Sequence, residues 1–194
     1  MSKRFAFLVD SARCIGCETC AMACKQYYQQ SQGIFWRKVI PLAANLYPHQ
    51  ERAFYSLACN HCKKPICAEV CPAKAYSIRD DGIVVHHQEK CIGCKNCVSA
   101  CPYSAPQFNA EKNKAEKCSL CYERLDAGLS PVCVQSCPVE ALRLVDLNAL
   151  RDKNAIQFPA GYPKAPQLDP GTRFTPPRKP KTVFSSSPTV KAKA

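Results

Sequence analysis

A run of four closely spaced cysteines followed by a proline constrains this chain more than any other feature. The run reads Cys91-Ile-Gly-Cys94-Lys-Asn-Cys97-Val-Ser-Ala-Cys101-Pro102, so two, two and three residues separate the cysteines. Three thiolates in so tight a loop can hold three corners of a cubane iron–sulfur cluster, and a fourth cysteine before a proline is typical of such sites. Structural zinc more often uses two separated ligand pairs, and neighbouring cysteines in a tight loop are badly placed for disulfides. The run therefore predicts a [4Fe-4S] site.

Three more groups of four contain all the remaining cysteines of the 194-residue chain. These groups are Cys14, Cys17, Cys20 and Cys24; Cys59, Cys62, Cys67 and Cys71; and Cys118, Cys121, Cys133 and Cys137. The first group repeats the spacing of the run at 91–101, and the other two share the pattern Pro-x-Cys-x-x-x-Cys-Pro, so the chain contains internal repeats. Because no cysteine is left over, a mixture of clusters and structural disulfides is disfavoured.

The formal net charge of +12 suggests a nucleic-acid partner, but the clusters would offset most of it. An oxidised [4Fe-4S] cluster with four thiolate ligands carries about −2. Four of them would leave the loaded protein near +4, since 12 − 8 is 4, and no recognition-helix pattern is visible. We therefore expect no nucleic-acid partner. We also expect no membrane span, because no run approaches the roughly 18 apolar residues that one needs, and no export signal of its own.

The apolar pattern predicts few regular elements. We expect a buried strand over 5–10, a strand pair within 33–42, a helix over 122–127 that Gly128 ends, and a strand over 141–145. The last two cysteines of each group lie four residues apart, so a helix there would place both thiols on one face, about 6 Å apart along its axis. One of the two could then ligate a second cluster, as in two-cluster ferredoxins. The spacing does not decide which groups exchange ligands.

Two regions contain no cysteine. Residues 25–58 are rich in aromatic residues and would serve packing or partner contact. Residues 147–194 are basic and rich in proline, which indicates an extended arm that wraps a partner or is partly disordered. Lysines also lie beside cluster cysteines, where positive charge would raise a cluster's potential; the alternative for each is a solvated lysine with little effect. These are Lys25, Lys63, Lys64 and Lys95.

The four groups, their order and two short phrases resemble one family. The phrases are Cys59-Asn-His-Cys62 and Cys101-Pro-Tyr-Ser-Ala-Pro-Gln107. They are similar to those of the four-cluster iron–sulfur (B) subunits of molybdopterin oxidoreductases, in particular of anaerobic dimethyl sulfoxide reductase, over roughly residues 4–145. The resemblance implies an α+β fold of two ferredoxin-like dicluster modules, with short strands and helices, a cluster-dominated core and an extended C-terminal arm. The implied division is a first/last-group module of 1–24 with 102–146, the aromatic insertion 25–58, a middle module of 59–101, and the arm 147–194.

In this family the first group exchanges a ligand with the last, and the second with the third. The ligand sets implied for this chain are set a, Cys14, Cys17, Cys20 and Cys137; set b, Cys118, Cys121, Cys133 and Cys24; set c, Cys59, Cys62, Cys67 and Cys101; and set d, Cys91, Cys94, Cys97 and Cys71. The similar nitrate reductase subunit has Trp at the position of Cys94 and holds a three-iron cluster there, so Cys94 implies four [4Fe-4S] clusters. His61 would be a redundant ligand, and we expect none from it.

The resemblance implies a non-catalytic electron-transfer subunit. It would pass electrons from a quinol-oxidising, integral-membrane anchor subunit to a molybdopterin catalytic subunit that reduces dimethyl sulfoxide or a similar S- or N-oxide. It would be peripheral to the cytoplasmic membrane, on the periplasmic face after export with its partner, or else in the cytoplasm. Two alternatives stay open. One is the corresponding subunit of a polysulfide, thiosulfate or tetrathionate reductase, and the other is a polyferredoxin partner of a soluble formate dehydrogenase or hydrogenase.

Overall fold

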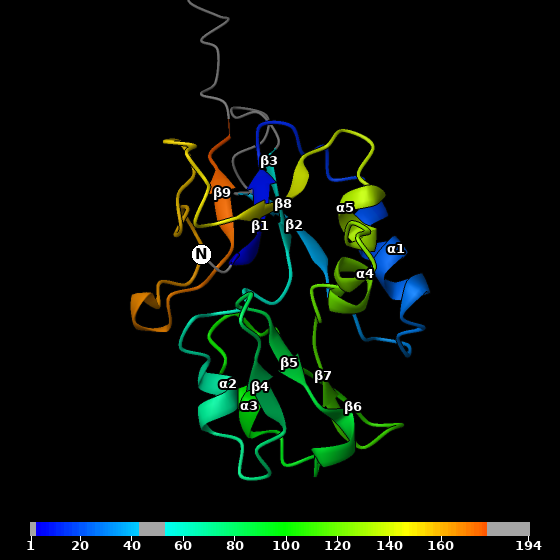
Figure 1. Ribbon diagram of the computed structural model, residues 1–194. Coiled ribbons are helices and arrows are strands. Elements are labelled where there is room, and N and C mark those ends of the chain that lie inside the picture. Colours follow the sequence, from blue (N-terminus) through cyan, green and yellow to red (C-terminus); the bar gives the residue numbers. More distant parts are fainter. Residues whose placement is uncertain (1–2, 43–52, 178–194) are drawn as a thin grey trace, which may run out of the picture.

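Two halves stacked one above the other make up the part of the chain that the computed structural model describes, residues 3–42 and 53–177 (Figure 1). One half holds β1 (Phe5–Asp10), α1 (Thr19–Tyr27), β2 (Lys38–Leu42), β3 (Ala53–Leu57), α4 (Tyr122–Asp126), α5 (Val132–Gln135), β8 (Leu142–Asp146) and β9 (Arg173–Thr175). The other holds α2 (Ile66–Glu69), β4 (Tyr76–Ile78), β5 (Val84–His86), α3 (Asn96–Ala100), β6 (Gln107–Asn109) and β7 (Lys114–Glu116). The short elements of both kinds confirm the predicted α+β class.

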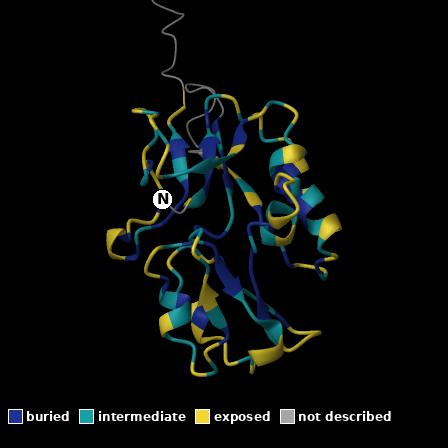
Figure 2. Ribbon diagram, in the orientation of Figure 1, coloured by how far each residue is buried: buried dark blue, intermediate teal, exposed yellow. Residues whose placement is uncertain are grey.

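β1 is the central strand of a three-stranded sheet. It pairs antiparallel with β8, where Phe7 lies opposite Leu144, and parallel with β9, where Val9 lies opposite Phe174. Its residues 6–9 are all buried, as an unbroken apolar run in a central strand requires. The strand predicted over 5–10 is confirmed, and the one predicted over 141–145 lies one residue further on. Figure 2 shows the buried residues running along β1 and down into β5 of the other half.

The strand pair predicted within 33–42 is wrong. That range contains one strand, β2, and its antiparallel partner is β3, which follows residue 52. The residues before β2 form turns instead. The Lys25 ammonium donates hydrogen bonds to the carbonyls of Gln30, Ser31 and Ile34, so this segment bends around the ammonium group. Residues 43–52 of the aromatic insertion lie outside the described residues.

The helices that carry the third cysteine of each group are short, and proline explains why. In the first group α1 includes both Cys20 and Cys24 and continues to Tyr27. In the other three groups the helix ends before the fourth cysteine. Those three fourth cysteines precede Pro72, Pro102 and Pro138, and a residue before proline is driven out of the helical conformation. The helix predicted over 122–127 is confirmed as α4, which ends at Asp126, and the N–H of the following Gly128 bonds to the Leu125 carbonyl.

Residues 147–177 of the predicted arm fold back over their own chain. Tyr162 accepts a hydrogen bond from the Asn60 side chain at 2.7 Å and stacks on Tyr103 at 5.3 Å between ring centroids. The Gly171 N–H donates to the Asn60 carbonyl, and β9 extends the sheet beside β1. This segment therefore covers the cysteine loop at 59–62. The low-complexity end, 178–194, lies outside the described residues. Within the described ranges, no helix is long and apolar enough to cross a membrane.

Candidate metal centres

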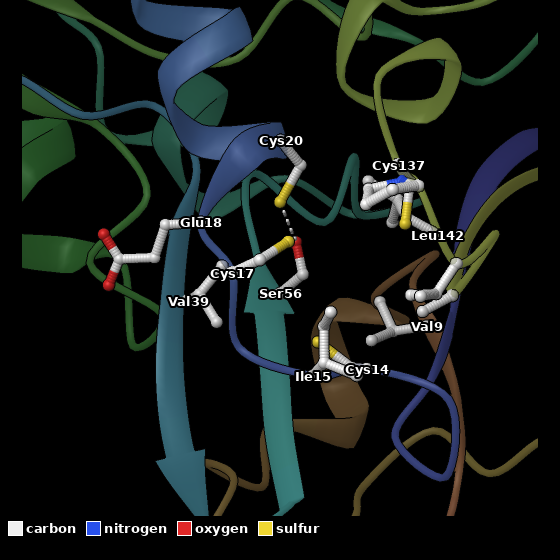
Figure 3. A pocket seen from close by; sticks show the side chains of 13 residues that line it. Val9, Cys14, Ile15, Cys17, Glu18, Cys20, Val39, Ser56, Cys137 and Leu142 are labelled. Atoms are coloured by element: carbon white, nitrogen blue, oxygen red, sulfur yellow. Dashed lines mark hydrogen bonds between the residues drawn. The ribbon is translucent and has the colours of Figure 1, made fainter.

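The cysteines of set a surround a small pocket beside the central sheet. Cys14, Cys17 and Cys20 approach it from the loop before α1 and from the first turn of that helix, and Cys137 comes from the segment after α5 (Figure 3). Val9 and Leu142 form an apolar wall. The Cys20 sulfur lies 3.3 Å from the Ser56 hydroxyl oxygen of β3, which fixes this thiol in place (Figure 3).

The cysteines of set b are neighbours in the same half, and their electrostatic coupling shows it. Burial, followed by the charge of Cys133 and then that of Cys121, raises the pKa of Cys24 to about 12. Burial and then Cys24 and Cys133 also raise the pKa of Cys118 well above its usual value. α1 packs against α5, which brings Cys24 to Cys133. These are thiols that would be deprotonated only with a strong cationic partner such as metal.

Sets c and d occupy the other half. Cys59, Cys62, Cys67 and Cys101 line a second pocket together with Pro65 and Leu168. Burial and then the charge of Cys59 raise the pKa of Cys67 to about 12. For set d, burial raises the pKa of Cys97 most, and the charges of Cys91, Cys94 and Cys71 add to it. α2 packs against α3, as α1 does against α5.

Each neighbourhood thus combines three cysteines of one group with the fourth cysteine of another, as the resemblance implies. Ligation itself stays a prediction. Across residues 3–42 and 53–177, no three His, Cys, Asp or Glu side chains converge tightly enough to hold a single metal ion. A cubane cluster spreads its thiolates around four separate irons and does not need such convergence.

The four neighbourhoods follow one another through the molecule. Burial is the larger cause throughout, but each set also contributes to the pKa of a cysteine in the next. The charge of Cys20 in set a raises the pKa of Cys133 in set b. The charge of Cys59 in set c raises the pKa of Cys118 in set b, and that of Cys97 in set d raises the pKa of Cys67 in set c. All sixteen cysteines lie in the described part, and only two of them are exposed, Cys17 in set a and Cys94 in set d. In the line a–b–c–d, the exposed cysteines therefore belong to the two end sets, and set b in the middle is buried throughout.

Two buried cations near these cysteines were not predicted from the sequence. Arg37 is 1% exposed, and Lys117 donates hydrogen bonds to the carbonyls of Val84 and Cys118. Arg37 lies in the aromatic insertion, outside all four cysteine groups, so no spacing rule identifies it. The lysines singled out from the sequence behave differently: Lys25 binds three carbonyls, and Lys95 lies over the Phe108 ring at 4.1 Å.

His61 packs at the junction of the two halves. Its Nδ1 accepts a hydrogen bond from the Val84 N–H at 3.0 Å. Burial, with Lys117 and Arg37 adding to it, lowers the pKa of His61 well below its usual value. The ring is therefore neutral and bound to the backbone through Nδ1, and the expectation that His61 is no ligand stays a prediction.

The residues present fit iron–sulfur clusters. The donors are all thiols, which are the ligands these clusters use. In addition, the Nε and Nη2 atoms of the Arg37 guanidinium are buried without a hydrogen-bond partner. A buried charge is costly unless an opposite charge compensates it. Anionic clusters beside Arg37 would supply that compensation.

Gly93 offers a direct test of the set d loop. Its φ is +73°, and a Cβ there would lie 2.5 Å from the Asn113 carbonyl oxygen, a backbone atom. Gly128 has the same φ of +73° and open space around it. Both Gly→Ala changes should cost roughly 1–2 kcal/mol for the left-handed backbone, and Gly93→Ala about 1–3 kcal/mol more for the overlap. Thermal unfolding and iron content of the two variants check this, and equal losses would contradict the described loop.

Comparison with known proteins agrees with this chemistry. A family model described as a 4Fe-4S dicluster domain matches residues 50–147, and one described as a 4Fe-4S binding domain matches residues 11–28. The protein is 41% identical to the B chain of anaerobic dimethyl sulfoxide reductase from Escherichia coli over 162 residues, 79% of each chain. It is 44% identical to the B subunit of tetrathionate reductase from Salmonella typhimurium over 69% of this chain and 54% of the relative. It is 35% identical to a formate dehydrogenase iron–sulfur subunit of Wolinella succinogenes, over 76% and 84%.

Proposed function

The chain belongs to the family of iron–sulfur subunits that includes the B chain of anaerobic dimethyl sulfoxide reductase, and on this premise we propose that it relays electrons from a quinol-oxidising membrane subunit to a molybdopterin catalytic subunit. It is an electron-transfer subunit, and the bond-breaking chemistry belongs to its partner. When bound, the clusters supply one-electron donors and acceptors.

Four [4Fe-4S] clusters are proposed, one in each cysteine neighbourhood. Three cysteines of a group hold one cluster. The remaining cysteine of the group, on or just after the short helix, ligates the neighbouring cluster instead. The ligands are those of sets a, b, c and d. The apolar side chains of Val9, Leu142 and Leu168 line two of the sites and would limit the access of water to them.

The observation that supports this function most strongly is the line of four sets with two accessible ends. A relay needs its inner centres shielded, because shielding prevents loss of electrons to other acceptors, and its end centres near the surface. Cys17 and Cys94 are the exposed cysteines, and they belong to the two end sets. We place the end with Cys94 against the membrane subunit and the end with Cys17 against the catalytic subunit.

The same arrangement supports a division into two dicluster modules. The first and last cysteine groups belong to the half around β1, and the second and third groups to the half around β4 and β5. Strands β6 and β7, at 107–116, lie beside β5 in Figure 1. Their position favours a module boundary after residue 116 over the one expected at 102.

For the substrate of the catalytic partner, we propose dimethyl sulfoxide or a similar S- or N-oxide. The match to the dimethyl sulfoxide reductase relative covers 79% of both chains, whereas the tetrathionate reductase match covers only 54% of its relative. The complex would be peripheral to the cytoplasmic membrane, on the periplasmic face after export with its partner.

Anaerobic purification of the native complex tests the proposal. We expect close to sixteen iron atoms per chain, from four clusters of four, and co-purification with a molybdopterin subunit that mass analysis identifies. Four to eight iron atoms per chain would contradict the four-cluster proposal. A protein that purifies alone, while passing electrons to a soluble dehydrogenase, would favour the polyferredoxin alternative.

A further inference from the structure

Arg37 is the most completely buried charged side chain near the cysteine sets. It precedes β2 and places its guanidinium carbon 4.2 Å from the centroid of the Phe7 ring in β1. Its Nη1 atom donates hydrogen bonds to the Ser56 carbonyl at 3.2 Å and to the Ser56 hydroxyl at 2.9 Å. The same hydroxyl contacts the Cys20 sulfur at 3.3 Å. Arg37 is therefore held from two sides and joined to set a through one hydroxyl group.

The rest of the guanidinium has no oxygen or nitrogen partner in the described residues. Its Nε and Nη2 atoms are buried without such a hydrogen bond, and no carboxylate in residues 3–42 or 53–177 forms an ion pair with it. Its neighbour is the Cys133 thiol; burial raises the pKa of that thiol most, and the charge and side-chain contact of Arg37 act to lower it. The groups near it that would become negative on binding a cluster are cysteine thiols. Burial alone would lower the pKa of Arg37, but the charges of Cys133, Cys118, Cys20 and Cys24 outweigh burial and raise it. Three of these four cysteines belong to set b.

We propose that Arg37 is a positioning residue that raises the reduction potential of the set b cluster, and less strongly that of set a, through its buried, fixed positive charge and the N–H groups of its Nε and Nη2 atoms. This inference rests on the proposed four-cluster function. Uptake of one electron adds one negative charge to a cluster, without a proton or any bond change. A cation stabilises that added charge more strongly in a site of low dielectric than the same cation would in water. Arg37 would then keep the set b cluster, an inner centre of the relay, easy to reduce.

A purely structural role for Arg37 is the alternative. Contacts with Phe7 and Ser56 alone would make Arg37 important for stability without changing any potential. The two roles separate in a redox titration of the purified complex, followed by electron paramagnetic resonance. The variants are Arg37→Gln, which removes the charge, and Arg37→Lys, which keeps it. The control is Arg13→Gln, because Arg13 lies next to Cys14 but is largely exposed and pairs with Glu140.

In Arg37→Gln we expect the reduced-to-oxidised ratio of one cluster signal, measured at the wild-type midpoint, to fall at least tenfold, which is about 59 mV for one electron. A second signal should move less, and the other two should not move. Arg37→Lys should show a smaller shift than Arg37→Gln, and Arg13→Gln none. Full iron content with no shifted signal would overturn the proposal while the four-cluster function stands, and so would an equal shift from Arg13→Gln. A wild-type complex lacking four clusters would instead refute the proposed function.

A measurement on the unmodified protein covers the case in which Arg37→Gln does not assemble. With nitrogen-15 in arginine only, pulsed resonance spectroscopy of the reduced complex should show a nitrogen-15 coupling on one cluster signal. Its absence would overturn the proposal, because the Nε and Nη2 atoms would then not face a cluster.

Discussion

Replacement of Cys94 by serine should abolish most quinol-linked reduction while artificial-donor activity of the catalytic subunit remains. Cys94 is one of two exposed cysteines and belongs to set d, the proposed entry from the membrane subunit. Loss of a partner that merely supports a metal ligand costs roughly 10–100-fold in affinity or activity, so loss of a ligand should cost at least as much. One cluster signal should change and the other three should persist. Parallel assays with quinol and with an artificial dye check this.

Ile92 provides the matched control for that experiment. It lies in the same loop, with 64% of its surface exposed, and its side chain is no ligand. Ile92→Ser should leave the four cluster signals unchanged. If Cys94→Ser preserves both activities, set d does not lie on the electron path. If it abolishes both, set d lies nearer the catalytic subunit than proposed.

The sequence predicted the type of metal centre in this protein better than it predicted which cysteine groups lie together in the fold. Spacing alone indicated cubane clusters, because three of the four ligands of such a site are local in the chain. The central strand at 5–10 was predictable because five apolar residues in a row have one favourable environment. The pairing of groups was not, since spacing permits several exchanges, and only the resemblance and then the packing of α1 on α5 favour one.

Long-range contacts account for what the sequence missed. β9 and Tyr162 come from a proline-rich region whose composition suggests an arm, yet the side chains of Phe174 and Tyr162 are buried among core residues. Arg37 reaches its cysteines only through the fold. Proline, by contrast, could have predicted the helix ends: Pro72, Pro102 and Pro138 each follow a fourth cysteine, and Cys24 has no such neighbour.

The second large effect concerns two cysteines at one short helix. Cys133 lies in α5, and Cys137 follows its end by two residues. Cys137 lines the pocket with Cys14, Cys17 and Cys20, whereas Cys133 is close enough to Cys24 for their charges to interact. Cys133→Ser should therefore change the set b signal and Cys137→Ser the set a signal. On α1 the order is mirrored, so Cys20→Ser should match Cys137→Ser, and Cys24→Ser should match Cys133→Ser.

Gln135 is the control, because it is exposed and lies between the two cysteines on the same helix. Gln135→Ala should leave every signal unchanged, which separates ligand loss from disturbance of α5.

The central claim is that neighbouring clusters exchange ligands. Two cysteines four positions apart, such as Cys133 and Cys137, then ligate two different clusters. The most direct test of this claim is a comparison of the resonance spectra and iron contents of the Cys133→Ser and Cys137→Ser complexes, purified without oxygen. We expect each variant to change one cluster signal, and the two variants to change different ones, with Cys24→Ser and Cys20→Ser as their respective matches. The same signal changed by both Cys133→Ser and Cys137→Ser would show that one cluster takes both thiols, and would contradict this account.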